Sequence, residues 1–143
     1  MKIVLACVVL FSAAAILTGA GPGVSFIAAD KVTNSLAKGG VLLTQPDLIV
    51  QGAHRDAPGQ VEVHDKETDV IYMIDGEATI VTGGTMVGGK NTAPGQWRGT
   101  EIQGGETQHL TKGDVIVVPA GIPHWFKEVP KSVNYFVVKA VKP

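Results

Sequence analysis

From Val41 onward, short apolar stretches alternate with turn residues along the chain. Gln60–His64 alternates polar and apolar residues with a period of two, which is typical of a strand whose two faces meet different surroundings. The same pattern predicts further strands at Val41–Leu43, Leu48–Val50, Val70–Ile74, Glu77–Thr82, Val115–Val118, Trp125–Val129 and Val133–Val141. About nine or ten short strands of this kind predict an all-β fold, a closed or sandwiched antiparallel barrel.

Two turn signals interrupt these strands. Asp75-Gly76 lies between two of the predicted strands and predicts a tight hairpin there. Residues 83–105 are rich in glycine and too long for a tight turn. Loops of this length in compact domains are commonly functional or mobile. We expect this segment to form an elaborated hairpin or flap that carries Trp97 and Arg98.

One short helix is predicted before the first strand. Asp30–Lys38 lacks strand alternation and begins with a residue that favours helix starts, since an aspartate side chain accepts hydrogen bonds from the first turn. Asp30 is therefore the expected N-cap. Gly39-Gly40 follows and would end the helix.

The first residues form a segment of a different kind. Lys2 precedes an uncharged apolar run, Ile3–Leu17, and small residues at 18–20 follow it. A basic, an apolar and a small-residue region in this order are typical of a secretory signal peptide. We expect residues 1–29 to be a signal peptide or N-terminal apolar segment, and residues 30–143 to form the domain.

Cleavage is feasible after Ala20 or after Ala29, and the second is favoured because Asp30 starts a polar segment. A cleaved protein would be exported to the periplasm or out of the cell, with no remaining membrane contact. The alternative is an uncleaved anchor, because residues 3–20 are barely long enough to span a bilayer.

Composition narrows the possible functions. The chain has 143 residues and a formal net charge of -1, which indicates one domain and no electrostatic footprint for nucleic acid. Cys7 is the only cysteine and lies in the apolar run. A cleaved protein would therefore have no disulfide and no thiolate ligand, and any metal would be held by nitrogen and oxygen.

One stretch has a spacing that points to a known family. From Gly113 to His124 the order is glycine, five residues, proline, one residue, glycine, two residues, histidine. Pro119 ends a buried strand, and Gly121 can adopt a positive φ so that the chain folds back before His124. This spacing resembles the second motif of the cupin superfamily, with Glu128 in place of its final asparagine.

The first cupin motif can be matched upstream of this stretch. Gly76 fits its closing glycine, Asp69 stands where the family has glutamate, and His64 fits one of its two histidines. Glu62 occupies the other histidine position. The resemblance covers about half of the chain and implies an antiparallel jelly-roll β-barrel into which these residues and His124 point.

The resemblance makes these four residues the candidate site. His64, Asp69 and His124 would hold a divalent metal, since two histidines and a carboxylate form a facial triad suited to Fe and accessible to Mn, Ni, Co or Zn. Glu62 would be a fourth ligand, a catalytic general base, or a residue that orients His64. Glu67 could replace Asp69 as the carboxylate. The alternative is a metal-free barrel whose polar cluster is satisfied by water and hydrogen bonds.

The resemblance implies two classes of function. The first is a metal-dependent enzyme on a small organic substrate, of dioxygenase, isomerase or lyase type. The second is a non-catalytic module that binds a small ligand or a metal. Similar small cupins pair through N-terminal strands, so we expect a homodimer with Val41–Val50 at the contact. His109 is expected to face outward, and His54 to lie in a loop or at the rim.

Overall fold

The computed structural model describes residues 23–143, and the candidate cleavage site after Ala20 lies outside them. The described elements are α1 (Ala29–Lys38), β1 (Gly40–Thr44), β2 (Leu48–Arg55), β3 (Val61–His64), β4 (Glu67–Thr82), β5 (Thr85–Val87), β6 (Lys90–Ala93), β7 (Gln96–Gly99), β8 (Glu101–Gln103), β9 (Glu106–Thr111), β10 (Val115–Val118), β11 (His124–Glu128) and β12 (Val133–Val141). The predicted all-β class with one short helix is confirmed. The strand count exceeds the prediction because the glycine-rich segment contains short strands of its own.

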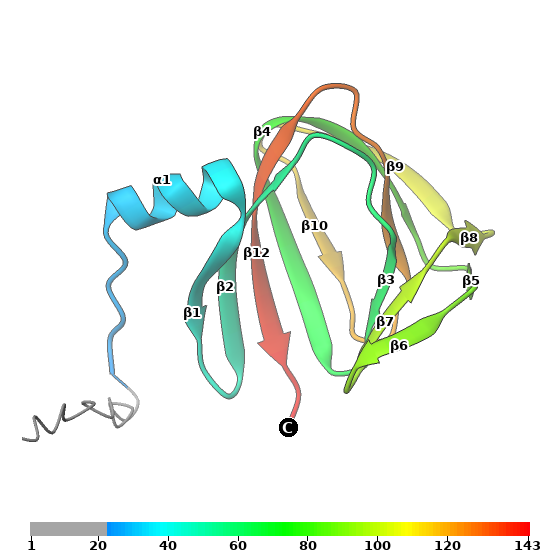
Figure 1. The fold of residues 1–143 in the computed structure, drawn as a ribbon, viewed down its shortest axis with the longest axis horizontal. Helices are drawn as coiled ribbons and strands as arrows, with labels where there is room; N and C mark the ends of the chain where they lie inside the picture. The colour runs from blue at the N-terminus through cyan, green and yellow to red at the C-terminus, as the bar shows by residue number, and fades with distance from the viewer. Residues whose placement is uncertain (1–22) are drawn as a thin grey trace, which may run out of the picture.

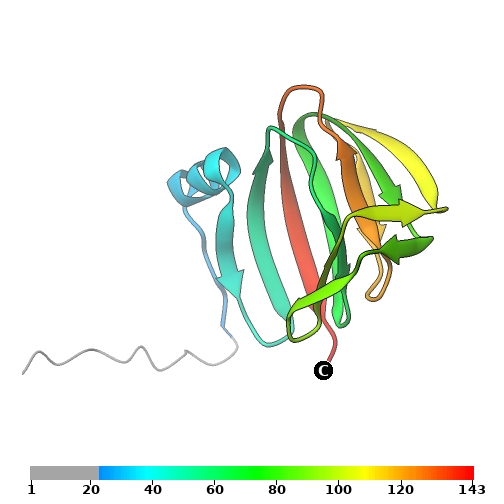
Figure 2. The ribbon, with the colours of Figure 1, turned by 45° about the vertical axis from the view of Figure 1, so that its right-hand side comes forward.

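Most of the strands belong to one antiparallel sheet that curls around a common interior (Figure 1). Its order is β1-β2-β12-β4-β11-β3-β7-β6, and β9 and β10 also pair with β4. The turned view in Figure 2 shows the strands wrapping into a jelly-roll-type barrel, with α1 at the outside next to β1. The predicted barrel is confirmed.

Strand β4 corrects the prediction of a hairpin at Asp75-Gly76, because the strand runs unbroken through this pair. Its first part pairs with β10 and β12, and its second part pairs with β9 and β11. Gly76 has a φ of 81°, and a Cβ there would collide with the carbonyl oxygen of Ser132. The glycine therefore bends one long strand from one part of the barrel into the next, instead of reversing the chain.

The interior contains one main apolar cluster. Its buried members are Ile71, Met73, Ala78, Ile80, Leu110, Phe126, Val129, Val133, Tyr135 and Val137. The rings of Phe126 and Tyr135 stack with their centroids 4.9 Å apart. Along β12 every second residue is buried, and this row ends at Lys139. The apolar core therefore gives way to polar side chains at one end of the barrel.

Helix α1 packs against β1 and β2 at the side of the sheet. Its N-cap is Ala28 and not the predicted Asp30. The helix starts earlier than expected, and Asp30 then lies in the first turn, where a carboxylate favours the positive end of the helix dipole. The helix ends at Gly39 as predicted. Within residues 23–143, no helix is long and apolar enough to cross a membrane.

The glycine-rich segment 83–105 folds into two short antiparallel pairs, β5 with β8 and β6 with β7. Strand β7 also pairs with β3, which carries Glu62 and His64. The segment is thus an elaborated hairpin, as expected, and part of it forms barrel wall. This pairing brings Gln96 and Arg98 of β7 beside the candidate site.

Candidate metal centre

The barrel brings the four predicted residues together from three strands. Glu62 and His64 lie two positions apart on β3 and so share one face, Asp69 lies on β4, and His124 begins β11 opposite Glu62. The turn before His124 is tied to the site, because Gly121, with a φ of 83°, donates its N–H to the His64 carbonyl at 2.8 Å. The spacing of the second motif therefore positions His124 beside His64 of the first motif.

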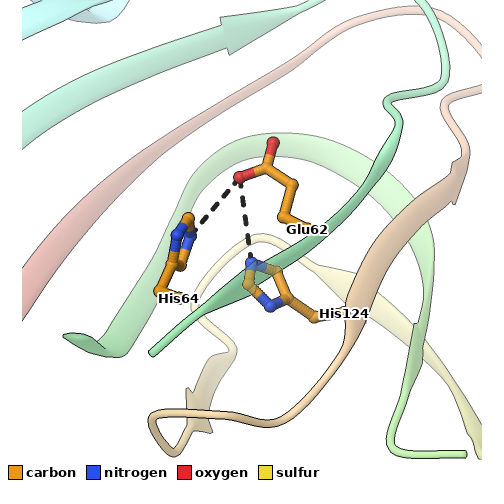
Figure 3. A group of neighbouring side chains, drawn as sticks. All are labelled: Glu62, His64 and His124. Atoms are coloured by element: carbon orange, nitrogen blue, oxygen red, sulfur yellow. Dashed lines mark ion pairs between the residues drawn. The ribbon is translucent and has the colours of Figure 1, made fainter. Parts of the chain in front are cut away.

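The donor atoms of these residues face one another, and Figure 3 shows one Glu62 oxygen directed at both imidazoles. Glu62 Oε2 lies 3.4 Å from His64 Nε2 and 4.0 Å from His124 Nε2. Asp69 Oδ2 lies 3.5 Å from the first of these nitrogens and 3.7 Å from the second. Two carboxylates thus flank two imidazole nitrogens in one small volume.

The hydrogen bond at Nδ1 of each imidazole ring determines that Nε2 faces the carboxylates. His64 Nδ1 lies 2.6 Å from Oε1 of Gln96, and the amide nitrogen of Gln96 donates to Glu67 at 2.8 Å. An amide oxygen only accepts, so Nδ1 carries a proton. His124 Nδ1 lies 3.3 Å from the carbonyl of Ile122 and is protonated for the same reason. In their neutral forms both rings therefore present the Nε2 lone pair to the cluster.

A buried lysine that sequence reasoning missed completes the cluster. Lys139 Nζ lies 2.8 and 3.0 Å from the two oxygens of Asp69 and 3.0 Å from Glu67 Oε2. It stands opposite Asp69 in the pairing of β12 with β4, and the residue is 8% exposed. The apolar residues at every second position, Val133, Tyr135 and Val137, were the available sequence signal, because alternation along a strand puts Lys139 on the same face.

Glu62 has a different set of partners. Its Oε1 lies 3.4 Å from Arg55 Nη2, and its Oε2 lies 3.6 Å from Arg98 Nη2. Arg55 is held in turn by Tyr135, whose hydroxyl accepts from Nε at 2.8 Å, and it stacks over the Phe126 ring. Neither arginine was assigned to the site from sequence, although Arg98 had been expected on the flap.

Sequence comparison identifies the family of the chain. A sequence model described as Cupin matches residues 52–143, more than half of the chain. The chain belongs to the cupin family. No curated protein matches it in sequence.

Solved structures share the fold of this cupin at low identity. KdgF from Halomonas sp. has a TM-score of 0.52 and 16% identity, covering 73% of this cupin and 79% of that chain. The DMSP lyase DddQ from Ruegeria pomeroyi DSS-3 has a TM-score of 0.50 and 16% identity, covering 72% and 42%. The cupin domain of Schizosaccharomyces pombe Cnp3 has a TM-score of 0.53 and 13% identity, covering 72% and 63%. Such likeness shows the fold, and one fold hosts many chemistries.

The electrostatics of the cupin site distinguish its members. Burial would raise the pKa of Glu62, but contact with His64 and the nearby guanidinium charges outweigh burial and lower that pKa to about 2. Burial would lower the pKa of His64, yet contact with Asp69 and Glu62 raises it to about 9. The pKa of His124 is lowered by burial. Without a metal, His64 is therefore protonated at neutral pH, and metal binding would release that proton.

The pKa of Asp69 is also lowered. Burial opposes this shift, and contact with His64 together with the charge of Lys139 outweighs it. Asp69 is therefore ionised and already paired with a cation in the metal-free site.

The site opens into a cavity of about 560 Å³, a size ordinary for a small-molecule pocket. Its apolar lining includes Ile49, Ile71, Phe126 and Val137. Its polar lining includes the four predicted residues with Arg55, Glu67, Gln96, Arg98 and Lys139. The cavity thus joins an apolar surface to a group of charged side chains.

The donor set fits a divalent transition metal. Donor atoms within 4.8 Å of one another come from Glu62, His64 and His124, and from His64, Glu67 and Asp69. Ligands held at about 2.0 to 2.2 Å from one ion lie roughly 3 to 3.6 Å apart. The Nε2–carboxylate distances of 3.4 to 4.0 Å therefore need only small side-chain movements. Imidazole and carboxylate donors suit Fe, Mn, Ni, Co and Zn.

Other residues singled out from sequence lie outside this group. His54 belongs to strand β2 and not to a loop, and its exposed side chain stands at the cavity rim. His109 faces outward, 3.4 Å from Glu77, as expected. Trp97 donates from Nε1 to Asp65 at 3.1 Å in an exposed contact. The next residue on β7, Arg98, lines the cavity.

Proposed function

We propose that this cupin binds one divalent transition metal through His64, His124 and Glu62 and uses it on a small organic molecule. The supporting observation is the Nε2 atom of His64, which is buried 3.4 and 3.5 Å from carboxylate oxygens of Glu62 and Asp69 and meets hydrogen-bond geometry with no partner among the described residues. A buried polar atom without a partner costs free energy. A cation placed between this nitrogen, His124 and Glu62 would remove that cost.

Glu62 is better supported than Asp69 as the carboxylate ligand. Both oxygens of Asp69 already contact Lys139, at 2.8 and 3.0 Å, whereas the arginine contacts of Glu62 are longer, at 3.4 and 3.6 Å. A pKa near 2 also makes Glu62 a weak base at neutral pH. We therefore assign it the ligand role in preference to the general-base role, with Asp69 as a further ligand when Lys139 moves aside.

A bound metal would polarise substrate oxygens or activate dioxygen. The protein residues supply the setting for this chemistry. Gln96 and the Ile122 carbonyl hold the two imidazoles so that Nε2 points inward, and the apolar wall shields one side of the cavity from water. A DMSP lyase with the same fold supports an enzymatic role, with dioxygenation, isomerisation or elimination as the reaction types.

A non-catalytic binding protein is the second candidate. Lys139 favours it, because this lysine gives Asp69 and Glu67 a cation in the absence of metal. A metal or small ligand could then be taken up and released without loss of the fold. The two candidates differ in one measurement: small molecules incubated with the metal-loaded protein are recovered unchanged from a binding protein and converted by an enzyme.

The metal site is tested by titrating Mn²⁺ into chelator-treated protein in a calorimeter. We expect Glu62→Gln to weaken binding by at least about tenfold, in the range found when groups around a metal are removed. Asp69→Asn should weaken it less. Lys127→Gln, an exposed change outside the site, serves as the control. Equal binding by the wild type and Glu62→Gln would overturn the assignment of Glu62.

We also propose that the protein is exported after removal of its N-terminal segment. The support is the basic, apolar and small-residue order of the first twenty residues. N-terminal sequencing of protein recovered from the periplasm or the medium tests this proposal. A mature chain that begins near residue 21 or 30 is expected, and a chain retained in membranes with Met1 intact would contradict it.

We further propose a homodimer. Strand β1 ends the order of the main sheet, and Val41 on it is 61% exposed, so its outer edge is open to pairing. Tyr72, Val115 and Val117 are also exposed, on strands β4 and β10, which pair with each other. Light scattering should give twice the mass of one chain, and a monomer at all concentrations would contradict the proposal.

A further inference from the structure

Two arginines line the cavity beside the candidate metal centre. The side chains of Arg55 and Arg98 are 26% and 30% exposed, so they are accessible from the cavity and partly shielded from solvent. They approach the same carboxylate, Glu62, at opposite oxygens. Only the Arg55 contact, at 3.4 Å, meets hydrogen-bond geometry. The cavity therefore holds two guanidinium groups around one weakly engaged carboxylate.

The two arginines keep donors free for another partner. Among the described residues, Arg55 donates from Nε to Tyr135 and from Nη2 to Glu62, and Arg98 donates from Nη1 to the Trp97 carbonyl. Each guanidinium has five N–H donors in a planar fork. Its remaining donors match the planar oxygens of a carboxylate.

The charge balance of the cavity also calls for an anion. The charged lining residues apart from histidines are three cations and three carboxylates: Arg55, Arg98, Lys139, Glu62, Glu67 and Asp69. These charges cancel. A divalent cation held by neutral His64 and His124 would leave the cavity with two uncompensated positive charges. A ligand with a negative charge would lower this excess in a partly desolvated space.

We propose that this cupin takes a small organic carboxylate, held by Arg98 and Arg55 beside the metal, with its carbon skeleton on the apolar wall. The proposal rests on the metal site proposed above and names its substrate class. The apolar wall of Ile49, Ile71 and Phe126 lies in the same cavity as both arginines. The ligand would thus place its charged group on the guanidinium fork and its apolar part against hydrocarbon.

The test compares two probes of nearly equal shape and different charge, 4-fluorobenzoate and 4-fluorobenzamide. Each is titrated against Zn²⁺-loaded protein and followed by ¹⁹F NMR. We expect the carboxylate to bind at least about tenfold more tightly than the amide, since hydrogen bonds to charged groups are the stronger kind. Equal affinities for the two probes would overturn the proposal.

Arg98→Gln is the decisive variant, because Arg55 also packs on Phe126 and Tyr135. We expect it to weaken 4-fluorobenzoate binding by about tenfold or more and to leave 4-fluorobenzamide binding unchanged. Arg98→Lys should restore only part of the affinity, because an ammonium lacks the planar fork. Lys112→Gln removes one exposed positive charge outside the cavity and should change neither probe. Unchanged carboxylate binding by Arg98→Gln would contradict the proposal.

Two further arms separate this inference from the metal site. Zn²⁺ affinity is measured alone on each variant, and Arg98→Gln should bind Zn²⁺ as tightly as the wild type or more tightly. The probes are also titrated into metal-free protein, where the arginines should still prefer the carboxylate, with lower affinity. If the wild-type protein does not bind Zn²⁺ but still binds 4-fluorobenzoate more tightly than 4-fluorobenzamide, only the metal site is refuted. A tenfold tighter fit of 4-fluorophenyl phosphate would refute the carboxylate class.

Discussion

Strands β4 and β12 build two contrasting halves of one barrel interior. In their pairing, Tyr135 faces Met73 and Val137 faces Ile71, and the next inward pair is Lys139 with Asp69. The first two pairs belong to the apolar core. The third begins a cluster of charged and ionisable groups, of which His64, Asp69, His124 and Lys139 are buried almost as deeply.

This difference indicates that the apolar half stabilises the fold and that the polar half serves a function. Burying apolar side chains contributes roughly 1.5 to 3 kcal/mol per large residue. Buried charges cost free energy unless each is paired, and replacing such groups by apolar residues of similar volume is often neutral or stabilising. The polar half therefore adds little to folding, and the metal site proposed above would account for its presence.

The largest effect is expected in the polar half when its built-in cation is removed. Lys139→Met leaves Asp69 and Glu67 without the ammonium that both contact. We expect the metal-free protein to lose about 3 to 5 kcal/mol of unfolding free energy. Added Mn²⁺ should restore part of this loss, because Asp69 can act as a further ligand once the lysine is gone and the ion then supplies positive charge beside it.

Urea unfolding with and without Mn²⁺ measures both quantities. Lys142→Met is the matched control, because Lys142 is exposed at the C-terminus and its loss should cost less than about 0.5 kcal/mol. A Lys139→Met protein as stable as the control would show that the charged cluster does not depend on its lysine.

The next effect belongs to the apolar half. Ile80 is fully buried in the core cluster, so Ile80→Ala should cost about 2 to 5 kcal/mol through lost burial and a cavity. The folded fraction should still bind metal with wild-type affinity, because Ile80 contributes no ligand. A large loss of metal affinity in folded Ile80→Ala would remove the distinction between the two halves.

A smaller effect is expected from the residue that orients His64. Gln96→Ala removes the acceptor at 2.6 Å from His64 Nδ1. Metal affinity should fall by about 10- to 100-fold, while stability changes little because Gln96 is only partly buried. Gln96→Glu keeps the acceptor for His64 but loses the donor to Glu67, so it should retain part of the affinity that Gln96→Ala loses. Equal losses in both variants would point to packing instead of orientation.

The stability of the metal-free protein should rise with pH in the acid range and fall with pH in the alkaline range. The pKa of His64 is raised from 6.5 to about 9, so its stabilising contribution is fully present below pH 6.5 and is lost as the pH rises through 9. The pKa of Glu62 is lowered from 4.5 to about 2, so its contribution is present above pH 4.5 and is lost as the pH falls through 2.

Urea midpoints across pH measure this rise and this fall. His64→Gln should flatten the decline between pH 6.5 and 9, and Glu62→Gln should flatten the rise between pH 2 and 4.5. A wild-type midpoint that stays constant across the alkaline range would contradict the charged state assigned to His64.

The sequence predicted the parts of the structure that depend on local spacing. The glycine and proline positions before His124 carried the resemblance to the cupin pattern, and this resemblance, together with the period-two strand at Glu62 and His64, predicted the barrel and the convergence of these residues. The same local logic was wrong at Asp75-Gly76, where the turn signal was real but the approach of the Ser132 backbone turns it into a bend within one strand.

The remaining site residues depend on pairing between distant strands. Gln96 reaches His64 because β7 pairs with β3, and Lys139 reaches Asp69 because β12 pairs with β4. No local pattern specifies those partners or their register. Alternation along β12 predicts that Lys139 faces inward, but only the register shows which carboxylates it contacts.

Metal content is the most direct test of the central claim. Protein purified without chelator is analysed by elemental mass spectrometry beside His64→Ala and His124→Ala. We expect about one divalent transition metal ion per chain in the wild type, as for a single site with imidazole and carboxylate ligands, and little metal in either variant. Sub-stoichiometric metal in the wild type that His64→Ala leaves unchanged would contradict a metal centre in this barrel.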